Sequence, residues 1–237
     1  MELGGKGANV GFAEAAENAG EKGGRHGMNN SGQSCNAPTR MLVEASRYDA
    51  AVAEATEVAA SIKVGPTTEA GRHMGPVVNK TQWKKIQGMI QVGIDEGARM
   101  TTGGTGLPEN MNRGFYVKPT IFADVTNDMR IAQEEIFGPV LVMIPFKDEA
   151  DAIRIANDTP YGLTNYVQST DGPKRNRMAR ALKAGMIEMH QQSRGHGAPV
   201  GGIKLAGPAR RGRLWGSGDS RVFQATPGGG WSQVSLD

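Results

Sequence analysis

The sequence lacks most of the features that mark exported, metal-binding or membrane proteins. Cys35 is its only cysteine, so no disulfide forms within the chain, and without a signal-like N-terminus this usage predicts a reducing, cytoplasmic setting. The 4 histidines are scattered without the spacing of metal ligands, which predicts that no metal takes part in catalysis. The longest strongly apolar stretch, residues 139–146, is far shorter than a membrane span, so no membrane anchor is expected.

The chain also lacks a strong excess of either charge. It carries 27 basic and 24 acidic residues, a formal net charge of +3, which is too balanced to indicate a nucleic acid as partner. The one local basic cluster, formed by Arg210, Arg211 and Arg213, is more typical of a solvated turn than of a binding patch. Binding to nucleic acid is therefore not expected.

The middle of the chain alternates between helix-like and strand-like segments. Ser46 is predicted to cap a helix over residues 47–62, and Asn79 is predicted to cap a second helix that ends at Gly97 or Gly103. Further helices are predicted over residues 148–157 and 175–183, and strands over 116–122, 140–144, 161–169 and 185–189. Pro119 would place the first of these strands at an edge or a bulge. This alternation predicts an α/β fold in which helices flank a sheet.

No internal repeat or long linker divides the chain, so we predict one main domain over residues 1–227. From about residue 195 glycine, proline and arginine dominate, and the pattern of helices and strands weakens. Residues 228–237 are predicted to form a tail or a short exchanged strand used in oligomerisation.

Cys35 lies in a polar context that suits an exposed bend, between Gln33-Ser34 and Asn36-Ala37-Pro38. A thiolate attacks carbonyl groups far better than a thiol does, and N–H groups at a bend leading into helix-like residues would stabilise the thiolate and an oxyanion. An arbitrary lone cysteine is more often a small buried hydrophobe, but these polar neighbours argue against that reading. Glu2 is the natural partner, since a carboxylate with a raised pKa can take a proton from water or a thiol.

A third segment, from Glu134 to Val140, carries two carboxylates and a phenyl ring before a Gly-Pro pair. A carboxylate can accept hydrogen bonds from two ribose hydroxyls, and an aromatic ring beside it can pack against a planar base. The same segment is also explained as the C-terminus of a helix, with a buried Phe137 and a Gly-Pro pair that ends the helix. No glycine-rich dinucleotide fingerprint or P-loop is present.

Together these segments resemble the aldehyde dehydrogenases, in the same order along the chain. The resemblance is carried by Glu2-Leu3-Gly4-Gly5-Lys6, by Gly32-Gln33-Ser34-Cys35 and by Glu134 to Val140. Weaker matches are Gly75-Pro76, Glu96-Gly97-Ala98, Pro119-Thr120, Tyr161-Gly162-Leu163, and Gly201-Gly202 with Lys204. The resemblance implies a sheet like that of the family's catalytic domain and the C-terminal, thiol-bearing half of such an enzyme, lacking the N-terminal nucleotide-binding domain.

The same resemblance implies how such a protein works. Cys35 would attack an aldehyde, a hydride would pass to NAD or NADP, and water activated by Glu2 would hydrolyse the resulting thioester. Glu135 and Phe137 match positions that hold the nicotinamide ribose and ring. The partners implied are a small-molecule aldehyde and either a homo-oligomer or a complementing N-terminal half. The chain alone is expected not to oxidise aldehydes at a useful rate.

The chain also departs from the family's pattern. His190, Val200, Ala206 and Arg211 stand where the family usually has Asn, Phe, Ser and an acidic residue. The helix expected before Cys35 is interrupted by glycines at positions 20, 23, 24 and 27, which predicts a thin helix. Two other functions therefore stay open, a non-redox structural or association remnant of the fold and a residual thiol esterase.

Overall fold

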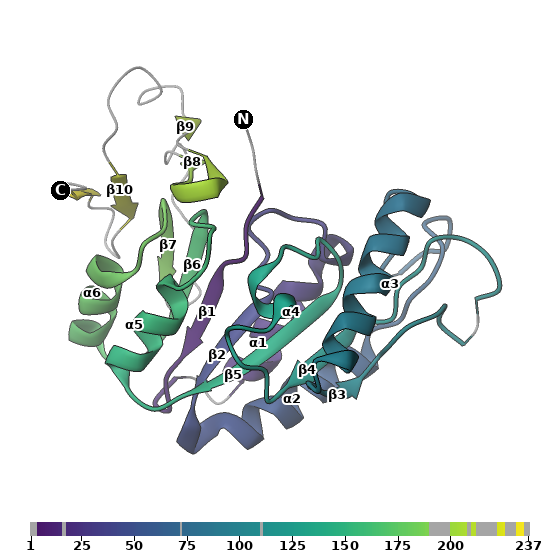
Figure 1. Ribbon diagram of the computed structural model, residues 1–237, viewed down its shortest axis with the longest axis horizontal. Coiled ribbons are helices and arrows are strands. Elements are labelled where there is room, and N and C mark those ends of the chain that lie inside the picture. The colour runs from purple at the N-terminus through teal and green to yellow at the C-terminus, as the bar shows by residue number, and fades with distance from the viewer. Residues whose placement is uncertain are drawn as a thin grey trace.

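The protein is an α/β fold built on one seven-stranded sheet, as the sequence predicts (Figure 1). The computed structural model describes residues 4–15, 18–71, 73–109, 111–189, 200–207, 210–211, 222–225 and 231–234. The strand order is β3-β4-β5-β2-β1-β6-β7; β3 runs antiparallel to β4, and the other neighbours are parallel. The strands are β1 (Ala8–Gly11), β2 (Arg40–Glu44), β3 (Arg99–Thr102), β4 (Thr120–Ala123), β5 (Val140–Phe146), β6 (Thr164–Gln168) and β7 (Met186–Met189).

Helices cover both faces of this sheet. One face carries α1 (Ala19–Met28) and α2 (Tyr48–Ser61), and the other carries α3 (Lys80–Asp95), α4 (Arg130–Gln133), α5 (Glu149–Asn157) and α6 (Gly172–Ala181). Neighbouring residues of a strand face opposite layers: Met41 packs with α1 and α2, while Leu42 packs with the larger cluster on the other face. A parallel sheet covered on both faces explains why β5 is an almost continuous apolar run.

Three helices begin at side-chain caps. Asn79 Oδ1 accepts a hydrogen bond from the Gln82 N–H at 2.9 Å, which confirms the predicted cap of α3, and Asp148 and Asp171 cap α5 and α6 in the same way. The predicted cap of α2 is wrong. Ser46 lies in a short 3-10 turn (Ala45–Arg47), and Arg47 occupies the cap position without a side-chain hydrogen bond.

Two strand predictions need correction. The segment 116–122 does not form a strand throughout, because β4 begins only at Thr120, directly after Pro119. Of the two predicted positions, β4 is not at an edge, since β3 pairs with it on the outer side, but the register of that pair shifts between Met100 and Thr102, as at a bulge. The sequence reasoning also missed β1 and β2, both of which lie in the middle of the sheet.

The glycine-rich segment before Cys35 forms a complete helix, α1, and not a thin one. Its glycines at positions 20, 23, 24 and 27 are all buried. A Cβ at Gly23 would lie 2.8 Å from Asn9 Nδ2, and one at Gly24 would touch Ala55 of α2. These glycines let α1 approach the sheet and α2 closely, which offsets their low helix propensity.

Beyond the sheet, β8 (Val200–Gly201) pairs with β9 (Arg210–Arg211), and β10 (Val222–Ala225) pairs antiparallel with β11 (Trp231–Val234). The predicted boundary between residues 227 and 228 falls in a segment outside the described residues, and an oligomerisation role for the last residues stays a prediction. Among the helices described, none is both long and apolar enough to cross a membrane.

Candidate active site

The sequence segments singled out for chemistry lie at one edge of the sheet. β5, β2 and β1 are consecutive, parallel neighbours. Gly4 to Gly7 precede β1, Cys35 and its turn precede β2, and Glu135 to Pro139 precede β5. Because the amino ends of parallel strands meet at the same edge, three segments far apart in sequence come together there. We call this the amino edge.

Close backbone contacts join the three segments. Gly5 lies so near the carbonyl oxygen of Cys35 that a Cβ at position 5 would overlap it. The Gly5 N–H donates a hydrogen bond of 2.8 Å to Glu135 Oε1. Gly32, with φ +68°, packs in the same manner on the backbone of Gly138. Residue 5 therefore contacts both the thiol turn and the Glu135 carboxylate.

Glu135 is held in a partly buried position at this edge. A Cβ at Gly4, whose φ is +89°, would overlap its carboxylate. Burial raises the pKa of Glu135, while the Gly5 N–H and the positive charges of Lys85 and Lys6 act in the opposite direction. Lys85 Nζ also donates to the Glu135 carbonyl oxygen at 2.8 Å. The carboxylate is thus held by the Gly5 N–H, and the charges of Lys85 and Lys6 favour its ionised form.

Phe137 has an unusual backbone conformation for a residue that is not glycine, with φ +55°. Gln82 of α3 stabilises it by donating from Nε2 to the carbonyl oxygens of Ile136, at 3.0 Å, and Phe137, at 2.8 Å. α4 ends at Gln133 with Glu134 as its C-cap, so the motif does begin at a helix C-terminus. The helix has ended well before Gly138-Pro139, and Phe137 is only partly buried, so the helix-stop reading accounts for the start of the motif and not for the rest.

Cys35 is partly exposed and lies in a turn closed by the Ala37 N–H, which donates to the Ser34 carbonyl oxygen at 3.0 Å. Upstream, Gln33 Oε1 accepts a hydrogen bond from the Val78 N–H at 2.9 Å. Downstream, the hydroxyl of Tyr166 donates to the Asn36 carbonyl oxygen at 2.6 Å. The expected bend is present, but it leads into strand β2 and not into helix-like residues.

Two buried basic residues at this edge, Arg40 and Lys6, were not predicted from the sequence as site residues. Arg40 is 0 % exposed, and its guanidinium donates to the carbonyl oxygens of Ile155 and Ala156 at the end of α5, at 3.1 and 2.9 Å. Lys6 is also 0 % exposed, and burial, with the nearby charge of Arg40, lowers its pKa to about 7. No described residue forms a hydrogen bond with Lys6 Nζ.

The signals for these cations were faint in the sequence. Lys6 belongs to the motif Glu2-Leu3-Gly4-Gly5-Lys6, but arginine and lysine side chains are ordinarily exposed, so the sequence alone does not predict that either is buried.

A third cation, Lys204, donates from Nζ to the carbonyl oxygens of Asn157, at 2.7 Å, and Thr159, at 2.9 Å. Basic side chains near the last carbonyl groups of a helix complement its dipole. Arg40 and Lys204 therefore both stabilise the end of α5.

Several predicted residues cannot be placed at the site. Glu2 and His190 lie outside the described residues. Val200 and Arg211 lie in β8 and β9, and their side chains are not described; Ala206 is buried in a short 3-10 turn (Lys204–Ala206). Within the described ranges no cluster of histidine, cysteine and acidic side chains is suited to a metal ion. Of the predicted site residues, Cys35, Glu135 and Phe137 come together at the amino edge.

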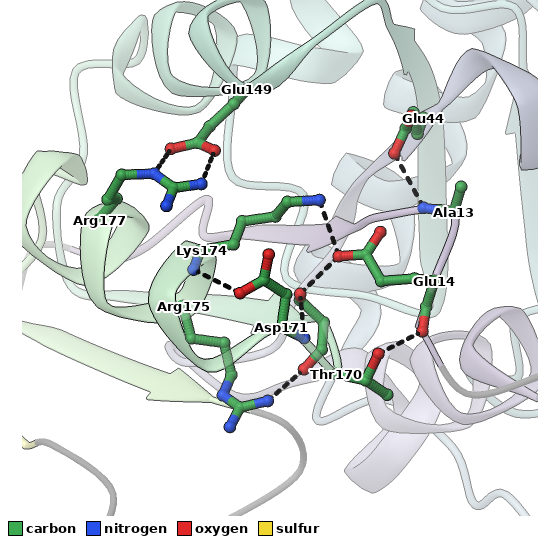
Figure 2. A network of polar contacts seen from close by, with 10 residues as sticks. Ala13, Glu14, Glu44, Glu149, Thr170, Asp171, Lys174, Arg175 and Arg177 are labelled. Carbon is green, nitrogen blue, oxygen red and sulfur yellow. Dashed lines mark hydrogen bonds and ion pairs between the residues drawn. The ribbon is translucent and has the colours of Figure 1, made fainter.

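The opposite, carboxyl edge of the same strands is organised by ion pairs (Figure 2). Glu14, just after β1, accepts hydrogen bonds from Lys174 Nζ at 2.8 Å and from the Ser169 hydroxyl at 2.7 Å. Lys174 also lies 4.5 Å from the ring centre of Phe12. Arg177 pairs with both carboxylate oxygens of Glu149.

Comparison with known proteins bears on the whole chain. The sequence profile described as "Aldehyde dehydrogenase family" matches residues 1–219. A Staphylococcus aureus (strain MSSA476) protein named as an aldehyde dehydrogenase is 44% identical over 189 residues, which make up 80% of this chain and 39% of that protein.

Solved structures resemble the fold over nearly its full length. The aldehyde dehydrogenase of Bartonella henselae covers 91% of this chain with 45% of its own, at 56% identity and a TM-score of 0.89. Aldehyde dehydrogenase C of Pseudomonas syringae, as a mutant complexed with NAD⁺ and octanal, covers 91% of this chain with 44% of its own, at 40% identity and a TM-score of 0.88. The chain thus spans less than half the length of each of these relatives.

Proposed function

The chain belongs to the aldehyde dehydrogenase family, and on that premise we propose that it supplies the thiol site for the oxidation of an aldehyde to a carboxylic acid. The observation that carries this proposal is the convergence of the Cys35 turn, Gly5 and Glu135 at the amino edge. Family membership alone would not require these segments to be intact. The aldehyde dehydrogenase of Pseudomonas syringae was crystallised with octanal and NAD⁺, which supports an aldehyde and a nicotinamide nucleotide as ligands here.

The residues present fit the cofactor that the family implies, NAD or NADP. Glu135 is a hydrogen-bond acceptor fixed through one oxygen by the Gly5 N–H, and a carboxylate has further lone pairs with which to accept ribose hydroxyls. Phe137 follows two residues later, with its backbone held by Gln82. We propose that Glu135 holds the ribose and that Phe137 packs against the nicotinamide. When bound, the nucleotide supplies the hydride acceptor.

In the proposed reaction the chain acts through Cys35. The thiolate adds to the aldehyde carbonyl carbon, forming a carbon–sulfur bond and an oxyanion, and the Cys35 N–H donates to that oxyanion. After loss of the hydride, the acyl group remains on sulfur as a thioester. Water, deprotonated by Glu2, attacks this carbonyl carbon and releases the acid and the thiol. Close packing of Gly5 on the Cys35 carbonyl keeps the turn from shifting during these steps.

An activated aryl ester tests the thiol site without the cofactor. The native chain is incubated with p-nitrophenyl acetate, and acyl adducts are located by mass spectrometry, with Cys35→Ala and a denatured sample as controls. A native-state adduct on Cys35 is expected. No adduct above the denatured background would overturn the proposal and favour a structural remnant of the fold.

A second measurement separates oxidation from simple ester hydrolysis. NAD(P)H formation from an aldehyde is followed by absorbance, and the chain alone is expected to form none at a useful rate. In parallel, the rate of Cys35 alkylation by iodoacetamide is compared with and without NAD⁺, for the native chain and for Glu135→Ala. The proposal expects NAD⁺ to change the alkylation rate only where Glu135 is present. Ester turnover that depends on Cys35 but is indifferent to NAD⁺ would favour a thiol esterase.

A further inference from the structure

The turn that carries Cys35 is held from both sides, by different parts of the molecule. Upstream contacts come from the loop before α3, where the Val78 N–H donates to Gln33 Oε1 and the Ser31 hydroxyl donates to the Gly75 carbonyl oxygen at 2.8 Å. The backbone pairing of β2 begins only at Arg40. Between Cys35 and that pairing, the Tyr166 hydroxyl ties the Asn36 carbonyl oxygen to the sheet at 2.6 Å.

Tyr166 reaches this turn from a strand that does not pair with β2. It lies in β6, next to Asn9 of β1, and β1 separates β6 from β2. Its side chain is 3 % exposed. The hydroxyl therefore extends along the face covered by α1 to the residue that directly follows Cys35. A short hydrogen bond at the end of a buried, rigid side chain fixes position more firmly than one from a surface side chain.

The ring of Tyr166 is itself held by α1. The His26 ring meets it edge-on, with 5.0 Å between the ring centres and 79° between the planes. Gly23, one helical turn earlier, lies against the ends of the buried Asn9 and Met41 side chains, which a Cβ at that position would crowd. The glycine thus brings α1 close enough for His26 to contact Tyr166. The helix before the thiol and the strand behind it act on the same turn.

We propose that Tyr166 is a positioning residue for the thiol: by holding the Asn36 carbonyl, it fixes the turn that presents Cys35 Sγ and the Cys35 N–H. The inference rests on the proposed role of Cys35 as nucleophile. Loosening the turn moves the backbone N–H donors away from the sulfur and from an oxyanion formed on attack. Removing the hydroxyl should therefore lower reactivity at Cys35 beyond any effect on stability.

The test uses Tyr166→Phe, which keeps the ring and deletes the hydroxyl. Tyr48→Phe is the matched control, because the buried Tyr48 hydroxyl donates to the Met143 carbonyl oxygen at 3.0 Å and accepts from the Asp124 N–H at 2.7 Å, away from the thiol turn. The rate of Cys35 alkylation by iodoacetamide is measured from pH 5 to 10 on the intact native chain. Acylation by p-nitrophenyl acetate and thermal unfolding are measured on the same samples.

Tyr166→Phe is expected to reduce both alkylation at neutral pH and acylation about 3- to 10-fold, the range for loss of one hydrogen bond, and to move the alkylation midpoint upward. Tyr48→Phe should leave both reactions unchanged even though it lowers stability. Superimposable profiles for the native chain and Tyr166→Phe would overturn the inference, whatever the loss of stability.

Failure of the proposed function is visible separately. If p-nitrophenyl acetate does not acylate the native chain but Tyr166→Phe still shifts the pH profile of alkylation, then Cys35 is not the proposed nucleophile, while Tyr166 still positions the turn. Should Tyr166→Phe fail to fold, His26→Ala removes the ring that packs on Tyr166 from the side of α1 and so loosens the side chain that holds the Asn36 carbonyl oxygen. It is expected to reduce alkylation about 2- to 10-fold, the range for loss of an aromatic pair, and no change would overturn the inference.

Discussion

The two edges of the parallel strands satisfy their polar groups in different ways. At the carboxyl edge, Glu14 and Lys174 pair with each other and with neighbouring polar groups, and helices α5 and α6 begin at capping aspartates. At the amino edge the chain segments meet backbone to backbone, at Gly5 and Gly32, and Lys6 is fully buried, which lowers its pKa to about 7. At the carboxyl edge, partly exposed ion pairs connect the elements. At the amino edge, side chains such as Gln82 and Arg40 bond to backbone carbonyl groups, and the segments also pack backbone against backbone.

The difference indicates where the molecule has been shaped for function. A buried lysine whose Nζ has no hydrogen-bond partner among the described residues is an unfavourable feature that a purely structural edge would not need. In many open α/β sheets ligands bind at the carboxyl ends of the strands. Here the candidate site lies at the opposite edge, where β1, β2 and β5 begin.

The largest expected effect is at Arg40. Arg40→Met should lower the free energy of unfolding by about 3–5 kcal/mol, because it leaves the Ile155 and Ala156 carbonyl oxygens without their buried donor. Urea denaturation followed by circular dichroism measures this change. A loss below about 1 kcal/mol, the ordinary effect of a surface substitution, would show that the buried guanidinium is not needed at the amino edge.

Lys6 is expected to respond in the opposite direction. Its folded-state pKa, about 7, is below the ordinary value of 10.5, so the penalty for burying the charge is fully present below pH 7 and disappears as the pH rises toward 10.5. Lys6→Met should therefore stabilise the chain by about 1–4 kcal/mol at pH 7 and by progressively less at higher pH. Urea titrations at several pH values test this, and a uniform destabilisation would reveal a partner for the ammonium.

Two glycines at the ends of β1 give the most direct comparison of the edges. Gly5→Ala should lower stability by about 1–3 kcal/mol and Cys35 alkylation about a hundredfold, because the new methyl group would overlap the Cys35 carbonyl oxygen. Gly11→Ala, at the other end, places its methyl group at an ordinary 3.8 Å from the nearest atom and should change neither. Equal effects at both positions would remove the distinction between the edges.

The smallest effect is expected at Glu14, at the carboxyl edge. Although burial raises its pKa, hydrogen bonds from Lys174 and Ser169 lower it overall. This contribution is present above the ordinary pKa of 4.5 and is lost as the pH falls through the lowered folded-state value. Glu14→Gln should cost about 0.5–1 kcal/mol at pH 7, and less in acid, without altering Cys35 alkylation. A change in the rate of Cys35 alkylation would show that the carboxyl edge influences the thiol at the amino edge.

Local features of the fold were predictable from the sequence, and those that depend on distant residues were not. The cap of α3 needs only Asn79 and the residue three positions later, so a few consecutive residues are enough to predict it. The character of α1 depends on Ala55 and Met41, which no local pattern joins to Gly23 or Gly24. Propensity therefore predicted a thin helix where packing produces a full one.

The site shows the same division. Cys35, Glu135 and Phe137 were identified because their motifs are compact, and the order of β5, β2 and β1 then brings them to one edge. Arg40 and Tyr166 were missed as site residues because their partners, the α5 carbonyls and the Asn36 carbonyl, lie more than a hundred positions away. Single buried polar residues give no periodic signal, so only the folded chain reveals them.

The long sequence separations at the amino edge also bear on how the chain is made. The hydrogen bonds from Gly5 to Glu135 and from Tyr166 to Asn36 each join residues 130 positions apart. At about 5–20 residues per second, a ribosome takes roughly 7–26 seconds to add that many residues. A nascent chain therefore carries Cys35 as an ordinary thiol for that interval, open to oxidation and to other thiols. On the positioning role proposed for Tyr166, the turn that presents Cys35 is completed only after Tyr166 has been synthesised and β6 has joined the sheet.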